Sequence, residues 1–98
     1  MDIAAWRRKL DKLDRKLVRM LNQRARAAQE IGRLKASTAM PIYEPKREQA
    51  VFENVRRANR GPFPDHDLKR VFEEIIGVMR RLQRAEILVR RKLRRRRK

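Results

Sequence analysis

The sequence has no cysteine and a single histidine, His66. Without cysteine there can be no disulfide, thiolate nucleophile or cysteine metal ligand, which suits a protein of the reducing cytoplasm. One histidine cannot form a histidine metal cluster, so we expect no metal site. No apolar run approaches the roughly 20 residues that span a bilayer, and the N-terminus lacks the apolar core of a signal peptide. We therefore expect a cytoplasmic protein without membrane contact.

Acidic residues are scarce relative to basic ones: 12 Asp and Glu against 29 Lys and Arg give a net charge of +17. The excess is uneven, because residues 80–98 hold eleven Lys and Arg but one acid, Glu86. The charge of the main body and that of the C-terminal end therefore need separate explanations. A chain of 98 residues forms one domain with a limited core, so help from a second subunit is expected.

Proline and glycine are rare, with 4 and 3 residues, and they divide the chain into three predicted helices. The first runs from about Ile3 to Ala36, with apolar residues spaced alternately by three and four, which is a heptad pattern. A helix of this length extends roughly 50 Å, more than a small domain can cover. The sequence therefore predicts an intertwined helical homodimer. The apolar residues of the pattern are Ile3, Trp6, Leu10, Leu13, Leu17, Met20, Ala27, Ile31 and Leu34.

Three of the four prolines lie in the two breaks between the helices, and the fourth, Pro45, stands at the start of the second helix. Pro41, in the break at residues 37–41, lacks an N–H and ends the first helix. A second helix, about 45–59, begins with a proline, which the first turn tolerates. Gly61 is expected at the C′ position of this helix, and Asp65 at the N-cap of the third. No strand pattern occurs, so the predicted fold class is all-α. The expected buried positions of the second and third helices are Val51, Phe52, Val55, Leu68, Val71, Phe72, Ile75, Ile76, Met79 and Leu82.

Two cations interrupt the apolar face of the first helix. The heptad spacing from Met20 arrives at Arg24, where an unpaired charge would be costly. Arg24 either reaches solvent, pairs with an acid such as Asp14, or awaits an anionic ligand. Lys35 follows about three turns later on nearly the same face, roughly 16 Å along the axis. The two side chains could hold a small anion between them, unless Lys35 is a solvated last-turn cation.

Three further polar residues lie beside the apolar stripes of the other helices. Arg47 and Glu48 each precede an expected buried position by one turn, and taken alone they are ordinary first-turn charges. Gln83 continues the apolar stripe of the third helix. It is either a core-edge glutamine satisfied by backbone or a ligand-binding residue.

The catalytic groups that are missing around these residues limit the kinds of reaction that the site could catalyse. His66 falls beside a helix start, where it is expected to be solvated, and neither a catalytic nucleophile nor a glycine-rich phosphate loop is present. What remains is a set of fixed cations and one neutral donor in a helical core. Such a site suits a dianionic small molecule and a reaction that needs no proton transfer.

Three stretches of the chain together resemble one protein family. They are residues 10–35 (LDKLDRKLVRMLNQRARAAQEIGRLK), residues 41–51 (PIYEPKREQAV) and residues 61–83 (GPFPDHDLKRVFEEIIGVMRRLQ). In this order they resemble the helix signatures of the all-helical chorismate mutases. The resemblance implies an isomerase domain at residues 1–84, which converts chorismate to prephenate in phenylalanine and tyrosine biosynthesis without a cofactor. Residues 85–98 lie outside the pattern and form a basic helical extension or tail.

The resemblance implies which cations bind the substrate carboxylates. Arg24 and Arg7 of the other subunit would hold them, with Arg47 nearby, since the planar guanidinium fork suits carboxylates. Arg7 and Arg24 are roughly 25 Å apart on one helix, so they cannot readily meet one ligand within one chain. This distance independently favours a dimer with shared sites.

The resemblance also implies how the remaining residues act. Lys35 and Gln83 would donate to the ether oxygen of the breaking bond, and Glu48 would accept from the ring hydroxyl. Glu44 occupies a substrate-binding position where aspartate is common. Met79 stands where the family commonly has a serine that contacts a carboxylate, so that contact must be lost or supplied elsewhere.

The main alternative function is nucleic-acid binding by a basic helical dimer. Eight of the last nine residues are basic, and the pI is near 11.7. Against this, Arg24 and Lys35 are expected inside the helical core. For the tail itself, a solvated helix end, nucleic-acid binding and docking on an acidic enzyme partner remain alternatives.

Overall fold

The computed structural model describes residues 2–97, which form three α-helices and no strand. These are α1 (Ile3–Ala36), α2 (Pro45–Ala58) and α3 (Asp65–Arg97). The all-helical, three-helix prediction is confirmed, and so are the limits of the first helix. None of the three helices contains a stretch long and apolar enough to cross a membrane.

Helix α1 is capped by side-chain hydrogen bonds at both ends. The carboxylate of Asp2 accepts a hydrogen bond from the Ala5 N–H at 2.8 Å, as expected of an N-cap. At the other end the Ser37 hydroxyl donates to the Leu34 carbonyl at 3.1 Å. No proline lies between these ends, so the helix continues for 34 residues.

The turn between α2 and α3 differs from the predicted one. Helix α2 ends at Ala58 with Asn59 as its C-cap, so Gly61 lies one residue beyond C′ and the predicted position was wrong. Gly61 has a φ of 75° and its N–H donates to Oδ1 of Asn59, so it is still the left-handed residue of the turn. Asp65 is not an N-cap either, because it is the first residue of α3 and its carboxylate accepts from Asn59 Nδ2 at 2.7 Å. The Asn59 side chain instead links the two sides of the turn, through the Phe63 carbonyl, the Asp65 carboxylate and the Gly61 N–H.

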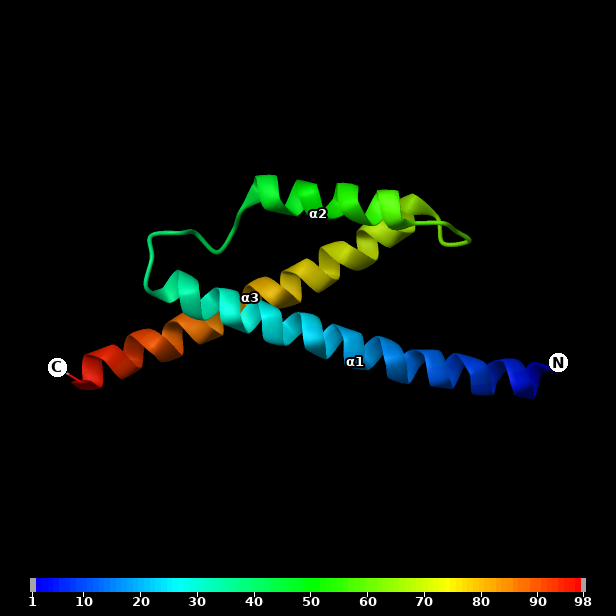
Figure 1. The fold of residues 1–98 in the computed structure, drawn as a ribbon, viewed down its shortest axis with the longest axis horizontal. Coiled ribbons are helices and arrows are strands. Elements are labelled where there is room, and N and C mark those ends of the chain that lie inside the picture. Colours follow the sequence, from blue (N-terminus) through cyan, green and yellow to red (C-terminus); the bar gives the residue numbers. More distant parts are fainter. Residues whose placement is uncertain (1, 98) are drawn as a thin grey trace.

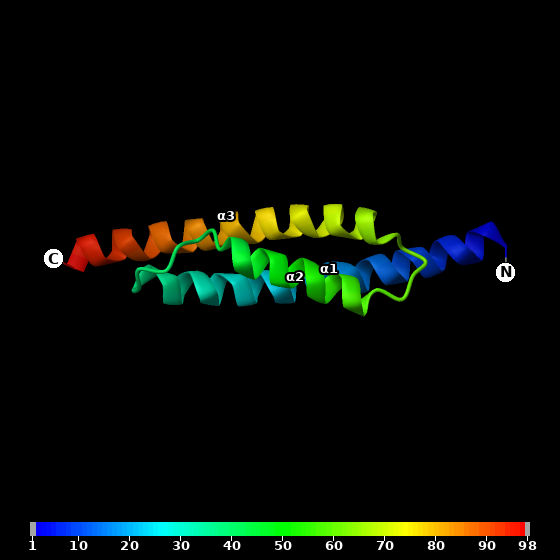
Figure 2. The same cartoon turned by 90° about the horizontal axis from the view of Figure 1, so that it is seen from above.

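Helix α3 is the common packing surface of the fold. It packs against both α1 and α2, whereas α1 and α2 do not pack against each other within residues 2–97 (Figure 1). The view from above shows α1 and α3 running side by side, with α2 crossing over them (Figure 2). At Gly32 the two helices α1 and α3 approach closely, since a Cβ there would lie 3.0 Å from Gln83 Cα. The space between α1 and α2 is therefore spanned by α3 and by the loop at residues 37–44.

The buried apolar core of the single chain is small. It consists of Ala28, Val51, Ile76, Met79 and Ile87. Of the predicted buried positions, Val51, Ile76 and Met79 are correct, while Val71 remains 44% exposed. The radius of gyration is 17.6 Å, compared with about 13 Å for a compact domain of about 100 residues.

The N-terminal half of α1 diverges from α2 and α3, and its outer end extends beyond them (Figure 1). Its heptad residues have no partner among residues 2–97, and Trp6, Leu10, Leu13, Leu17 and Met20 are each 49–65% exposed. We call these five residues the apolar seam. A monomer rarely leaves such a continuous apolar surface uncovered.

Candidate active site

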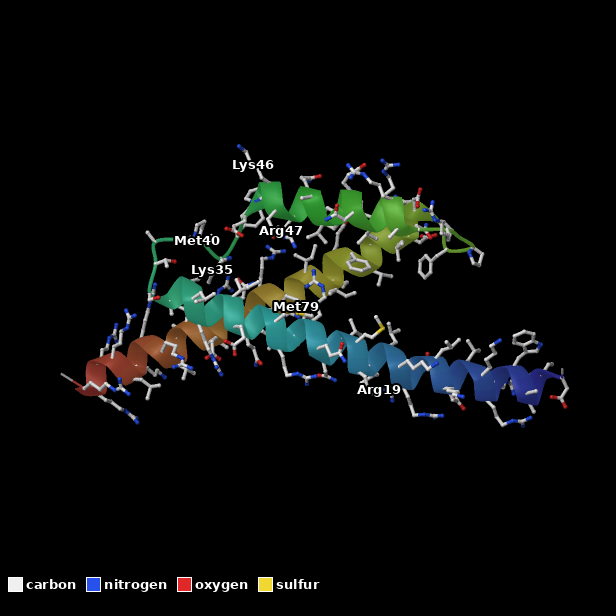
Figure 3. All side chains as sticks on the ribbon, in the orientation of Figure 1. Arg19, Lys35, Met40, Lys46, Arg47 and Met79 are labelled. Carbon is white, nitrogen blue, oxygen red and sulfur yellow. The ribbon has the colours of Figure 1, made fainter. Side chains whose placement is uncertain are left out.

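The three helices and the 37–44 loop line an open pocket of about 560 Å³. Pockets for small organic ligands typically have roughly 300–1,000 Å³. Lys35 and Arg47 point into the space between the helices, whereas Arg19 and Lys46 point away from it (Figure 3). Polar residues from four segments line the pocket: Arg24, Lys35, Glu44, Arg47, Glu48, Arg80 and Gln83.

Six of the seven residues predicted for the site are thus brought to one pocket. Arg7 is the exception, because it lies on the projecting half of α1 and is exposed. Arg24 and Arg7 do not meet within one chain, as the length of the helix predicted. Helical geometry alone explains this outcome, because residues seventeen positions apart are roughly 25 Å apart.

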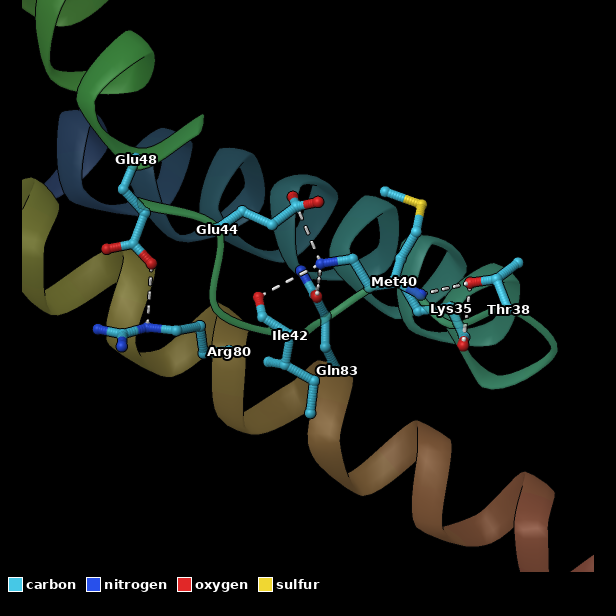
Figure 4. A network of polar contacts seen from close by, with 8 residues as sticks. All are labelled: Lys35, Thr38, Met40, Ile42, Glu44, Glu48, Arg80 and Gln83. Carbon is cyan, nitrogen blue, oxygen red and sulfur yellow. Dashed lines mark hydrogen bonds and ion pairs between the residues drawn. The ribbon is translucent and has the colours of Figure 1, made fainter. Parts of the chain in front are cut away.

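Lys35 is the most buried charged side chain of the pocket, with 5% of its surface exposed. Its ammonium donates to Gln83 Oε1 at 3.1 Å and to the Ile42 carbonyl at 3.3 Å (Figure 4). Glu44 Oε2 lies 3.5 Å from the same nitrogen. Lys35 is therefore not a solvated helix end, because its ammonium makes two hydrogen bonds and one ion pair inside the pocket.

The contact with Lys35 determines the orientation of the Gln83 amide. Since Oε1 accepts from the ammonium, the Nε2 group is left as the donor. No acceptor for Nε2 occurs among the described residues, so this donor is available to a ligand. The backbone of Gln83 is fixed by the close packing against Gly32.

Arg24 and Arg47 carry the positive charges of the pocket that no acidic side chain compensates. Neither has an acid within ion-pair distance in the described part of the chain, and Arg24 does not pair with Asp14. Burial and, next, the positive charge of Arg47 lower the pKa of Arg24 from its ordinary value. An arginine keeps its proton under such a shift, so the pocket holds two unpaired guanidiniums.

The acids of the pocket, in contrast, each have a cation. Glu44 approaches Lys35, and Glu48 Oε2 lies 3.4 Å from Arg80 Nε. Two acids and four cations leave a net charge of +2 at the pocket. This charge matches a ligand that carries two carboxylates.

Among the seven polar residues of the pocket, Arg80 is the one that the sequence did not predict. It belongs to a run of basic residues on α3, which looks like a solvated face when read as sequence alone. Its position three residues before Gln83 was the available signal, because residues i and i+3 share a helix face. Its neighbour Met79 also lines the pocket, is 6% exposed, and offers only a thioether there.

The chain is similar to known proteins in both sequence and fold. The family model for chorismate mutase type II matches residues 6–84. The chain is 35% identical over 87 residues to the bifunctional chorismate mutase/prephenate dehydratase of Aquifex aeolicus, which covers 85% of this chain and 24% of that protein. The chain thus spans about a quarter of the length of that curated relative.

Two solved structures have the same fold. The structure of chorismate mutase (form II) from Thermus thermophilus superposes with a TM-score of 0.81 at 38% identity, covering 84% of this chain and 93% of that chain. The Helicobacter pylori chorismate mutase, solved in complex with prephenate, gives a TM-score of 0.78 at 26% identity and covers 87% and 92%. Together with the family match over most of the chain, these similarities establish that the protein belongs to the type II chorismate mutase family.

Proposed function

We propose that this protein catalyses the rearrangement of chorismate to prephenate. The observation that carries the proposal is the charge arrangement of the pocket: two unpaired guanidiniums face a lysine–glutamine pair. The substrate is a flexible dianion, and the guanidiniums of Arg24 and Arg47 would hold its carboxylates in the compact shape that reacts. Orientation of this kind can supply several kcal/mol, up to about 7–11, of a reaction barrier.

The Lys35–Gln83 pair would act on the breaking bond. As the ether bond breaks, negative charge develops on its oxygen, and donors fixed in advance stabilise that charge. Gln83 presents Nε2 for this purpose because Lys35 already occupies its Oε1. Lys35 would exchange its longest contact, the 3.5 Å approach of Glu44, for the ether oxygen. No proton transfer and no covalent intermediate are required.

We further propose that the functional unit is a homodimer with shared sites. The apolar seam of α1 is exposed in the single chain, and burying a large apolar side chain contributes about 1.5–3 kcal/mol. Arg7 lies on the same half of α1, outside its own pocket. A second chain that covers the seam would bring its own Arg7 towards this pocket.

The basic end of α3 is the basis of a second, separate proposal. The helix continues without a break from residue 84 to Arg97, beyond the family match, and Arg94–Arg97 form its last turn. We propose that this segment binds a polyanion electrostatically, either nucleic acid or an acidic protein. The site residues of the pocket lie before it in the sequence.

The proposed activity is tested by following the loss of chorismate absorbance with the purified protein. Arg24→Ala should reduce kcat/KM by roughly 100-fold or more while leaving the helical circular dichroism unchanged. Arg26→Ala is the matched control, because Arg26 is an exposed arginine of α1 outside the pocket. A wild-type protein without turnover would refute the activity, and an Arg24→Ala variant within tenfold of wild type would remove Arg24 from the site.

A further inference from the structure

Arg80 occupies an unusual place on the wall of the pocket. Its guanidinium carbon lies 5.3 Å from the centre of the Tyr43 ring. Its Nε lies 3.4 Å from Glu48 Oε2, as Figure 4 shows. The Nε atom is buried, yet this approach lacks hydrogen-bond alignment and no other described residue accepts from it. Leaving a buried donor without a hydrogen-bond partner costs free energy. A bound ligand could therefore stabilise the pair by bringing the Glu48 carboxylate into alignment with Arg80 Nε.

The surroundings of Glu48 explain why such a partner matters. Glu48 shares the pocket with Arg24 and Arg47, whose guanidiniums have no acid of their own. The fourth cation, Lys35, is already occupied by Glu44, Gln83 and the Ile42 carbonyl. A Glu48 carboxylate released from α3 would therefore turn to the two free guanidiniums. There it would neutralise the charges that the substrate carboxylates need.

The packing of the helices does not prevent the Glu48 side chain from reorienting in this way. Helix α2 does not pack against α1, and it is joined to α1 by the 37–44 loop. Between α2 and α3, the contact of Glu48 with Arg80 is the one ion pair among residues 2–97. The side chains are 18% and 38% exposed, so the pair is only partly screened by solvent.

We propose that Arg80 is a positioning residue that holds Glu48 on the α3 side of the pocket. This inference rests on the proposed function. By retaining Oε2, Arg80 leaves Oε1 free to accept the substrate hydroxyl and keeps the carboxylate away from Arg24 and Arg47. Arg80 thus prevents the Glu48 carboxylate from competing with the substrate for these two guanidiniums.

The test is a double-mutant cycle in the full-length protein. Arg80→Met should raise KM by about tenfold with a smaller effect on kcat, because Glu48 then competes with the substrate for the guanidiniums. Arg80→Lys should recover most of the loss, since an ammonium can also reach Glu48. Glu48→Gln should raise KM in the wild-type background but lower it in the Arg80→Met background, because a neutral amide cannot neutralise the guanidiniums.

The reversal of sign separates this role from its alternatives. If Arg80 contacted the substrate directly or only supported the fold, Glu48→Gln would add to the damage of Arg80→Met, and that result would overturn the inference. Arg81→Met is the matched control on α3 and should leave both constants unchanged, with circular dichroism checking each fold. A wild type that does not turn over chorismate would instead refute the proposed function, and the positioning role with it.

Discussion

Replacing Gly32 with alanine would place a methyl group where α1 and α3 pack closely together. The new Cβ would lie 3.0 Å from Gln83 Cα, 3.1 Å from its carbonyl oxygen and 3.2 Å from Glu86 Cβ. Comfortable contacts between such atoms are about 3.5–4.0 Å, so the helices must separate by roughly 0.5 Å. The obstructing atoms belong largely to the backbone, which cannot rotate away as a flexible side chain could.

The effect on stability should be modest, because two terms oppose each other. Overpacking costs about 1–3 kcal/mol, while replacing a helical glycine with alanine returns about 1 kcal/mol. The effect on activity should be larger, because the separation occurs at the residue that presents the amide to Lys35, now 3.1 Å away. A misplacement of about 1 Å can cost 100-fold, so we expect kcat/KM to fall by about tenfold.

Gly77→Ala is the matched control for this variant. Its Cβ would meet only the Arg81 Nη1 atom, at 3.9 Å, which is ordinary contact. It should keep wild-type kcat/KM and should raise stability by up to about 1 kcal/mol. Initial rates of chorismate loss and thermal unfolding by circular dichroism measure both quantities. If Gly32→Ala kept the kcat/KM of Gly77→Ala, the packing at residue 32 would not set the geometry of the site.

Four further predictions address the dimer, the charges and the tail. Mixing the inactive variants Arg7→Ala and Arg24→Ala should restore activity, because a mixed dimer contains one site without either change; no recovery after proven subunit exchange would contradict shared sites. In Arg24→Lys, burial and Arg47 should lower the lysine pKa below its ordinary value, so kcat/KM should fall as pH rises through that pKa while wild type stays flat. Gln83→Glu should gain activity as pH falls, because a carboxyl group donates to the ether oxygen only when protonated, and a flat profile at full activity would remove Gln83 from the breaking bond. Deleting residues 90–98 should leave kcat largely intact and weaken binding to polyanions, which should also decline steeply with salt; a large loss of kcat would show that the tail supports the site.

The sequence by itself determined the helices and most of the candidate pocket. The uninterrupted heptad pattern and the clustered prolines specify where α1 begins and ends, because helix propensity and proline geometry are local properties. Charged residues such as Arg24 and Lys35 on an apolar face likewise indicate a special environment, since burial of a charge is costly wherever the partner lies.

The tertiary structure decided what depends on contacts between distant segments. Asn59 replaced Gly61 and Asp65 as the organiser of the second turn, because its amide reaches both sides of that turn at once. The role of Arg80 emerged only when α2 placed Glu48 beside it, since a run of basic residues does not reveal which member faces inward. The orientation of the Gln83 amide also required the packed helices, because a hydrogen bond to a lysine 48 positions away cannot be read from helix periodicity.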